Sequence, residues 1–204
     1  DIVAVFADHA IEFGNPHDVL VYKGDLSFLE AEIATIATSS LRRKAQWLHR
    51  YPHHNIENLR GNVNTRLQKL TDNPWNGAIF AAAGLERINK LPEKHLVLDW
   101  MLPAPAQGAI VVVVREDNVA LQKKLLPLHD DYTYIATQLE RDFLRALEGG
   151  CTAPIGAFAE FKDEKLYFKG GLWSEDGKEA SVIDEVLTQI DEYTGEKLAT
   201  MIKG

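Results

Sequence analysis

The chain has 204 residues, of which 46% are hydrophobic and 25% are charged, a composition typical of a globular protein with one large domain or two small ones. Its formal net charge of −8 argues against a general binder of polyanions, and no apolar run approaches the length of a membrane span. The single cysteine excludes a disulfide within the chain and, with no signal-like N-terminus, leads us to expect a cytoplasmic protein.

Apolar runs and turn signals predict alternating strands and helices in the first half of the chain. The expected strands are 1–8, Asp18–Tyr22, Glu32–Thr38, Asn55–Leu59 and Ala78–Ala83. The expected helices are Ser40–Arg50, Val63–Leu70 and a short one that follows Gly84 and carries Arg87. We expect Thr38 or Ser39 to cap the first helix and Asn62 the second, because their side-chain oxygens accept hydrogen bonds from free N–H groups.

Arginines gather where these predicted strands meet their helices. Arg42 and Arg43 fall in the first turn of one helix, Arg60 and Arg66 lie around the start of the next, and Arg87 follows the third junction. Arginine in a first helical turn opposes the helix dipole, so anion binding explains this position better than a solvated basic helix face does. Three strands that end at arginines predict an open α/β sheet that binds an anion at its carboxyl edge.

The second half of the chain is predicted to form a loop, Pro103–Gly108, and then a small α+β unit. The expected elements after that loop are strand Ala109–Arg115, helices Leu121–Leu128 and Tyr132–Glu148, strands Ile155–Phe161, Leu166–Trp173 and Glu179–Ile183, and helix Glu185–Ile202. Short turns at 162–164 and 175–177 separate the three strands, so we expect them to form an antiparallel meander.

The only cysteine lies in the run LEGGCTAPIG, residues 147–156. Gly149 is a natural stop for the preceding helix, and Gly149 and Gly150 leave room for something bulky near the Cys151 thiol. On position alone, a small buried cysteine is the plainer alternative. None of the seven histidines sits in a recognisable base motif, and no zinc-ligand spacing is present in the sequence. We therefore interpret Cys151 as an attachment point for an anionic group near the arginines.

Five segments of the sequence together resemble one family. The segments are TSSLRRKAQ (38–46), LRGNVNTRL (59–67), AAAGLERI (81–88), PAPAQGA (103–109) and LEGGCTAPIGA (147–157). In this order they resemble hydroxymethylbilane synthase, also called porphobilinogen deaminase. The resemblance implies an open α/β sheet domain, similar to periplasmic binding proteins, followed by a small α+β domain with a three-stranded antiparallel sheet. The implied divisions are a remnant of a first domain (1–35), an arginine-rich α/β domain (36–102), a crossover segment (103–128) and a C-terminal domain that carries the cysteine (129–204).

The resemblance also implies a chemistry. The family condenses four porphobilinogen molecules head to tail, with release of ammonia, on a cysteine-linked dipyrromethane, as a transferase of porphyrin and haem biosynthesis. Cys151 matches the cysteine that carries this cofactor. The implied cofactor contacts are Thr38, Ser40, Arg42, Arg43 and Arg60, and the implied substrate contacts are Arg66, Arg87 and Gln107. Each added ring brings two carboxylates, which gives a physical reason for many arginines.

The sequence departs from the family's pattern in a few places. Ala37 and Ala106 stand where the family commonly has glycine. The family's catalytic aspartate has no match here, and we expect it upstream of Asp1, so the chain is predicted to be a fragment with no catalytic residue of its own and little activity alone. Porphobilinogen is the expected partner, without nucleic acid, membrane or metal, and a full-length family member is expected to be a monomer.

Two other functions would account for parts of the sequence. A non-catalytic α/β module that holds a small carboxylate would explain the arginines but would leave Cys151 without a role. RNA binding through the basic stretch would need aromatic stacking platforms, and only Trp47 and Tyr51 lie there. The acidic net charge also argues against RNA binding.

Overall fold

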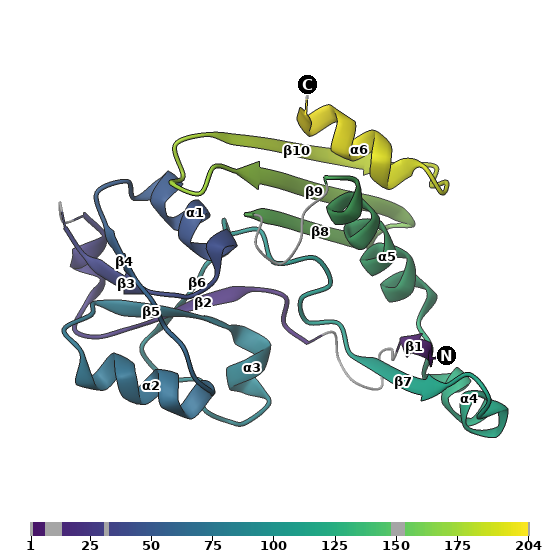
Figure 1. The fold of residues 1–204 in the computed structure, drawn as a ribbon, viewed down its shortest axis with the longest axis horizontal. Coiled ribbons are helices and arrows are strands. Elements are labelled where there is room, and N and C mark those ends of the chain that lie inside the picture. The colour runs from purple at the N-terminus through teal and green to yellow at the C-terminus, as the bar shows by residue number, and fades with distance from the viewer. Residues whose placement is uncertain (1, 7–13, 31–32, 148–153, 204) are drawn as a thin grey trace.

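The computed structural model of the chain describes residues 2–6, 14–30, 33–147 and 154–203 (Figure 1). Within these residues the strands form a five-stranded mixed sheet, a three-stranded antiparallel sheet and a two-stranded ribbon. Helices cover the two larger sheets, and the chain passes from the five-stranded sheet through the ribbon to the three-stranded sheet. Each of the two larger sheets therefore builds a hydrophobic core of its own.

The five-stranded sheet has the strand order β4-β3-β5-β2-β6. Its strands are β2 (Asp18–Tyr22), β3 (Thr35–Ala37), β4 (Asn55–Glu57), β5 (Gly77–Ala81) and β6 (His95–Val97). β3 runs parallel to β4 and β5, whereas β2 runs antiparallel to β5 and β6. As a consequence Asp18, the first residue of β2, pairs with Ala81, the last residue of β5, and lies at the carboxyl edge of the parallel strands.

Both faces of this sheet are covered, because successive strand residues point to opposite sides. On one face, Leu20 and Ile79 pack with Trp47 of α1 (Leu41–Arg50) and with the 3₁₀ helix η1 (Leu26–Glu30). On the other face, Val19 and Phe80 pack with α2 (Val63–Asp72) and α3 (Ala82–Glu86). A sheet buried on both faces reads as short apolar runs rather than as alternation, as the sequence of β2 and β5 does.

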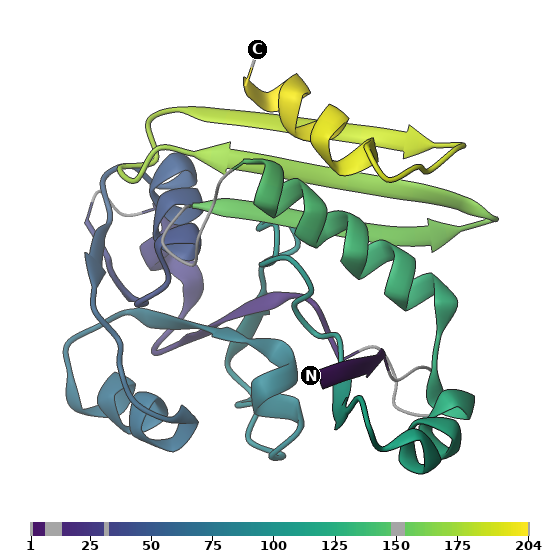
Figure 2. The same cartoon turned by 45° about the vertical axis from the view of Figure 1, so that its right-hand side comes forward.

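The C-terminal unit packs two helices on one face of the three-stranded sheet (Figures 1 and 2). Its elements are α5 (Asp131–Ala146), β8 (Ile155–Lys162), β9 (Lys165–Trp173), β10 (Ala180–Leu187) and α6 (Thr194–Lys203). Phe143 of α5 and Phe168 of β9 lie edge to face at the centre of this core, with ring centroids 5.1 Å apart. β8 is an edge strand of the sheet, since the strand order is β10-β9-β8.

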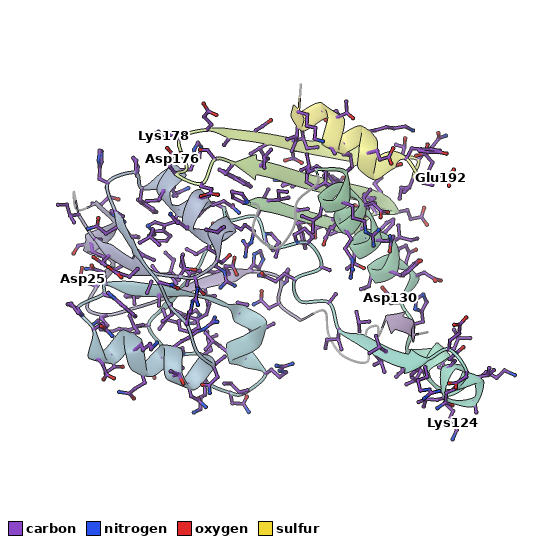
Figure 3. The ribbon with its side chains drawn as sticks, in the orientation of Figure 1. Asp25, Lys124, Asp130, Asp176, Lys178 and Glu192 are labelled. Carbon is purple, nitrogen blue, oxygen red and sulfur yellow. The ribbon has the colours of Figure 1, made fainter. Side chains whose placement is uncertain are left out.

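A two-stranded ribbon joins these units. It pairs β1 (Ile2–Phe6) antiparallel with β7 (Val111–Arg115). The chain continues through α4 (Val119–Leu125) and a short 3₁₀ helix, η2 (Leu126–Leu128), to Asp130, which caps α5. Asp130 and Lys124 mark this stretch in Figure 3. In β7 the side chain of Val113 is 61% exposed, whereas that of Val114 is buried.

The α/β sheet and the following three-stranded antiparallel meander confirm the predicted fold class. Three local predictions were wrong. The cap of α1 is Ser40, whose hydroxyl accepts a hydrogen bond from the Arg43 N–H, rather than Thr38 or Ser39. Gly84 lies inside α3 rather than before it. β10 extends to Leu187, where the predicted last helix had already begun, because its backbone pairs with β9 along its whole length.

β2 falls within the range 1–35 predicted as a remnant of a first domain, and it lies hydrogen-bonded between β5 and β6. The domain boundaries themselves stay a prediction. The helix stop expected at Gly149 lies outside the described residues. None of the helices in the described part of the chain is long and apolar enough to span a membrane.

Candidate anion-binding site at the sheet edge

Several chain segments meet at the carboxyl edge of the parallel strands. β3 leads into Thr38–Arg43, and β4 leads into Arg60 and then α2. β2 begins at this edge, and β6 ends there and leads into the loop that contains Leu102 and Gln107. Carboxyl edges of parallel strands are common ligand sites in open α/β sheets, because the loops that follow the strands converge there.

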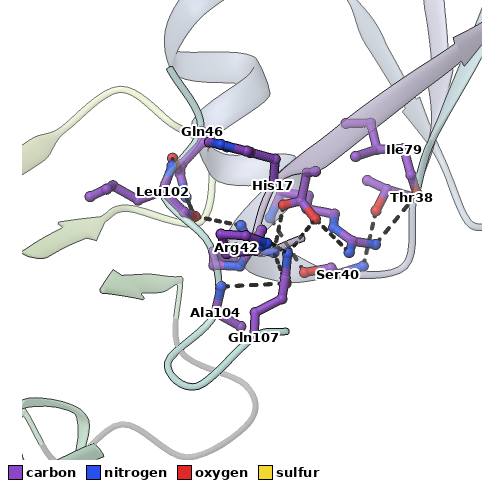
Figure 4. A network of polar contacts seen from close by, with 12 residues as sticks. His17, Thr38, Ser40, Arg42, Gln46, Ile79, Leu102, Ala104 and Gln107 are labelled. Atoms are coloured by element: carbon purple, nitrogen blue, oxygen red, sulfur yellow. Dashed lines mark hydrogen bonds and ion pairs between the residues drawn. The ribbon is translucent and has the colours of Figure 1, made fainter. Parts of the chain in front are cut away.

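A buried aspartate, Asp18, lies at this edge, and Figure 4 shows the polar contacts among the residues around it. Asp18 is fully buried, and its carboxylate accepts hydrogen bonds from Arg42 Nη2 at 2.8 Å, Arg43 Nη2 at 2.7 Å and Gln107 Nε2 at 2.9 Å. Burial by itself would raise the pKa of Asp18, but the charges and hydrogen bonds of the two arginines hold that pKa below its usual value of 3.8. Asp18 is therefore ionised at neutral pH and pairs with both guanidinium groups.

Arg42 donates two further hydrogen bonds, both to the loop after β6. Its Nη1 donates to the Leu102 carbonyl at 2.5 Å, and its Nη2 also donates to Gln107 Oε1 at 3.2 Å. The side chain is buried, and this burial lowers the pKa of Arg42, against the opposing effect of Asp18. A guanidinium nonetheless stays protonated at neutral pH. Arg42 thus lies fixed between β2, α1 and the loop after β6.

Arg43 is less completely bonded than Arg42. Its Nη2 reaches Asp18, and its Nη1 donates to the Ile79 carbonyl at 3.4 Å, which is a long contact. Its Nε is buried and has no hydrogen-bond partner among the described residues. A buried donor without a partner costs about 1–3 kcal/mol, so this nitrogen favours an added acceptor.

The cluster carries an excess of positive charge. Arg42 and Arg43 supply two positive charges, and Asp18 supplies one negative charge between them. The hydroxyls of Thr38 and Ser40 lie alongside, and each accepts a backbone hydrogen bond, from the N–H of Ser40 and of Arg43 respectively. Neither hydroxyl donates a hydrogen bond to another described residue, so each O–H can donate to a ligand. The site as a whole offers a positive charge and several donors, which suits a carboxylate or another oxyanion.

The structure brings together five of the predicted site residues, namely Thr38, Ser40, Arg42, Arg43 and Gln107 (Figure 4). Three others lie apart from these contacts. Arg60 and Arg87 are exposed, and Arg66 is half-buried and donates through Nε to the Gly61 carbonyl at 2.7 Å. Within the described residues, no ion pair joins any of these three arginines to an acidic side chain. They remain available cations on the segments that follow β4 and β5.

Cys151 lies outside the described residues, which continue at Pro154, just before β8. Gly156 in β8 packs so tightly against Leu102 that an added Cβ would lie 2.7 Å from the Leu102 Cβ. Leu102 is also held by Gln46 of α1, whose amide donates to its carbonyl at 2.9 Å and accepts from its N–H at 2.8 Å. The strand that follows the cysteine segment therefore contacts the residue whose carbonyl binds Arg42.

Sequence reasoning missed Asp18, Gln46 and Glu140 as residues of this site. The sequence did carry a signal for Asp18, since an acidic residue at the start of an apolar strand needs a hydrogen-bond or ion-pair partner if it is buried.

Glu140 lies on α5 and is 4% exposed. Its carboxylate accepts the Ala106 N–H at 2.5 Å and the Ala159 N–H at 2.7 Å. Burial raises the pKa of Glu140 to about 7, although those two hydrogen bonds oppose part of the change.

Comparison with known proteins identifies the family. The family model described as porphobilinogen deaminase, dipyromethane cofactor binding domain, matches residues 5–123, and the one described as porphobilinogen deaminase, C-terminal domain, matches residues 134–204. The chain belongs to the porphobilinogen deaminase family. The arginine cluster therefore lies in the part of the chain that matches the family's cofactor-binding domain.

Individual relatives named porphobilinogen deaminase agree with this. The one from Syntrophotalea carbinolica is 42% identical over 177 residues, which are 85% of this chain and 55% of the relative. The one from Macrococcus caseolyticus is 42% identical over 71% of this chain and 48% of the relative. The one from Geobacillus kaustophilus is 38% identical over 91% of this chain and 61% of the relative. The chain thus spans about half to three-fifths of the length of these relatives.

Asp18→Asn is expected to destabilise this porphobilinogen deaminase family member by about 3–5 kcal/mol, because it leaves the buried Arg42 and the partly buried Arg43 without a counter-charge. Urea unfolding followed by tryptophan fluorescence measures the change. Asp117→Asn is the matched control, since Asp117 pairs with Arg115 on the surface, where the two side chains are 66% and 79% exposed. Equal effects of the two substitutions would contradict the central role of Asp18.

Glu140 is expected to make stability fall as the pH rises. Its pKa is about 7 in the fold and about 4.5 when exposed, so the folded chain binds the proton more tightly. Its contribution is therefore fully present below about pH 4.5 and is lost as the pH rises through 7, amounting to about 3 kcal/mol. Urea midpoints measured from pH 4.5 to pH 8 should show this slope in the wild type. The slope should be reduced in Glu140→Gln and unchanged in the surface control Glu192→Gln.

Proposed function

We propose that this chain contributes the cofactor anchor and the carboxylate-binding edge of a hydroxymethylbilane synthase. That enzyme condenses four porphobilinogen molecules head to tail on a cysteine-linked dipyrromethane and releases ammonia. The observation that carries the proposal is the pair of guanidinium groups that share one buried carboxylate. It gives a fixed excess of positive charge at the sheet edge, within the region that matches the family's cofactor-binding domain.

The residues at the edge fit the dipyrromethane group. That group carries acetate and propionate side chains, which are carboxylates at neutral pH. Arg43 offers a buried Nε that lacks an acceptor in the described part of the chain, and Thr38 and Ser40 each have an O–H to donate. When bound, the group supplies the pyrrole carbon to which porphobilinogen units are added.

The chain's own residues then have distinct roles. Cys151 holds the cofactor through a thioether, and Arg42 and Arg43 orient its carboxylates with Thr38 and Ser40. Arg60 extends the cofactor contacts, while Arg66 and Arg87 offer exposed cations for the carboxylates of incoming porphobilinogen. Gln107, whose amide is bonded to Asp18, Arg42 and the Pro16 carbonyl, contributes to substrate binding from beside the arginine pair.

Charge complementarity explains why arginine suits these positions. Each porphobilinogen unit brings two carboxylates, and a guanidinium binds a carboxylate through two parallel N–H groups. Asp18 holds Arg42 and Arg43 before a ligand arrives, so little side-chain entropy is lost on binding. The same proposal gives porphobilinogen as the small-molecule partner and the cytoplasm as the location.

Covalent attachment at Cys151 is tested by the intact mass of the chain after incubation with porphobilinogen, measured in denaturing acid. Loading requires the deaminating condensation for which this chain is expected to have little activity, so we expect a slow and partial gain of two linked pyrroles on the wild type. Cys151→Ser should keep its bare mass. An adduct that persists in Cys151→Ser would place the attachment on another residue. Binding of porphobilinogen that is equally tight in both proteins, with no adduct on either, would favour a non-catalytic carboxylate-binding module.

Arg43→Lys is expected to weaken porphobilinogen binding about tenfold, which corresponds to about 1.4 kcal/mol, because lysine keeps the charge but loses the Nε donor and the planar fork. Isothermal titration calorimetry measures the affinity. Arg50→Lys provides the matched control, since Arg50 lies exposed at the other end of α1 and stacks on Trp100. If the two variants bound porphobilinogen alike, Arg43 would have no part in recognising it.

A further inference from the structure

The edge of β8 that faces away from β9 contacts the loop after β6. Strand edges normally leave N–H groups without partners, and β8 has one such edge. Here the Ala157 N–H donates to the Pro103 carbonyl at 3.1 Å, and two residues further on the Ala159 N–H donates to Glu140 Oε1 at 2.7 Å. A loop carbonyl and the Glu140 carboxylate thus accept alternate N–H groups along this edge.

The second oxygen of Glu140 holds the loop itself. Glu140 Oε2 accepts the N–H of Ala106, and Ala106 has a φ of 62°, in the left-handed region that non-glycine residues rarely adopt. Such a conformation persists only where surrounding contacts enforce it. The hydrogen bond to Glu140 is such a contact. One carboxylate therefore joins the edge of β8 to the strained residue of the loop.

The residue that follows Ala106 reaches the arginine cluster. Gln107 donates through Nε2 to the Pro16 carbonyl at 2.6 Å and to Asp18 at 2.9 Å, and its Oε1 accepts from Arg42. Figure 4 shows Gln107 directed from this loop toward Arg42. The path from Glu140 to the site thus consists of one hydrogen bond, one peptide unit and the Gln107 side chain.

A carboxylate is suited to this position because it must accept two N–H groups. A carboxylate has two acceptor oxygens and no donor when ionised, so it can receive both N–H groups together. A glutamine there would turn its NH₂ group toward one of the two donors. The carboxylate is 4% exposed and has no ion-pair partner among the described residues, which is a costly arrangement for filling space alone.

We propose that Glu140 is a positioning residue, which fixes the loop at Ala106 and, through Gln107, sets the arrangement of Asp18 and Arg42. Its link to porphobilinogen binding rests on the function proposed above, but its effect on Gln107 does not. In this way the C-terminal unit, which carries the Cys151 segment, fixes the position of the arginine pair relative to β8.

The test compares Glu140→Gln with Glu160→Gln in the ¹⁵N-labelled chain. Glu160 lies next to Ala159 on β8 and pairs with Lys162 at the surface, so it is a matched control on the same strand. In Glu140→Gln we expect the Gln107 side-chain amide resonances to shift and their exchange with water to accelerate at least tenfold, and porphobilinogen to bind three- to tenfold more weakly. In Glu160→Gln both should stay as in the wild type.

The outcomes separate the inference from the proposed function. Unmoved Gln107 resonances in a folded Glu140→Gln would overturn the inference, since a merely structural glutamate would lower stability without reaching Gln107. If the wild type fails to bind porphobilinogen, the proposed function is wrong. The shift and exchange rate of the Gln107 amide resonances then decide the role of Glu140 by themselves. If Glu140→Gln does not fold, the hydrogen-exchange rate of the Ala106 backbone N–H in the wild type tests the role of Glu140 instead. Strong protection is expected, and exchange at the rate of an open loop would overturn the inference.

Discussion

The shared carboxylate of Asp18 is the interaction on which the sheet edge depends. Two guanidinium groups buried side by side would repel each other and would lose their hydration, and neither cost is tolerable without a counter-ion. Asp18 supplies one negative charge within 2.8 Å of both. Because it neutralises only one of the two positive charges, the edge keeps a net positive charge.

Strand direction places that carboxylate. Asp18 begins β2, and β2 runs antiparallel to β5, so its first residue lies where the parallel strands end. The antiparallel β6 then returns the chain to the same edge and delivers Leu102, whose carbonyl accepts from both Arg42 and Gln46. A wholly parallel sheet would have put the start of β2 at the opposite edge. The mixed topology therefore serves the site.

The two larger sheets are linked through short polar contacts rather than through one continuous core. Gln46 binds Leu102 through two hydrogen bonds, His49 Nδ1 lies 2.8 Å from the Gly177 carbonyl, and Glu140 binds Ala106 and Ala159. Directional contacts of this kind fix the position of one unit against the other, whereas hydrophobic contacts alone would allow sliding. Under the proposed function, these contacts would keep the Cys151 segment and the arginine pair at a constant distance.

The sequence by itself determined the class of the fold, most of the elements and the family, because apolar periodicity, Gly and Pro signals and five local motifs are all short-range features. It also predicted an anion site at Arg42 and Arg43. The tertiary structure alone decided that these arginines share Asp18, which lies 24 residues before Arg42. It also decided that β10 continues through Leu187, because pairing with β9 outweighed the helical pattern of residues 185–202. The role of Glu140 was equally invisible, since its partners Ala106 and Ala159 contribute only backbone N–H groups, and no sequence pattern marks them.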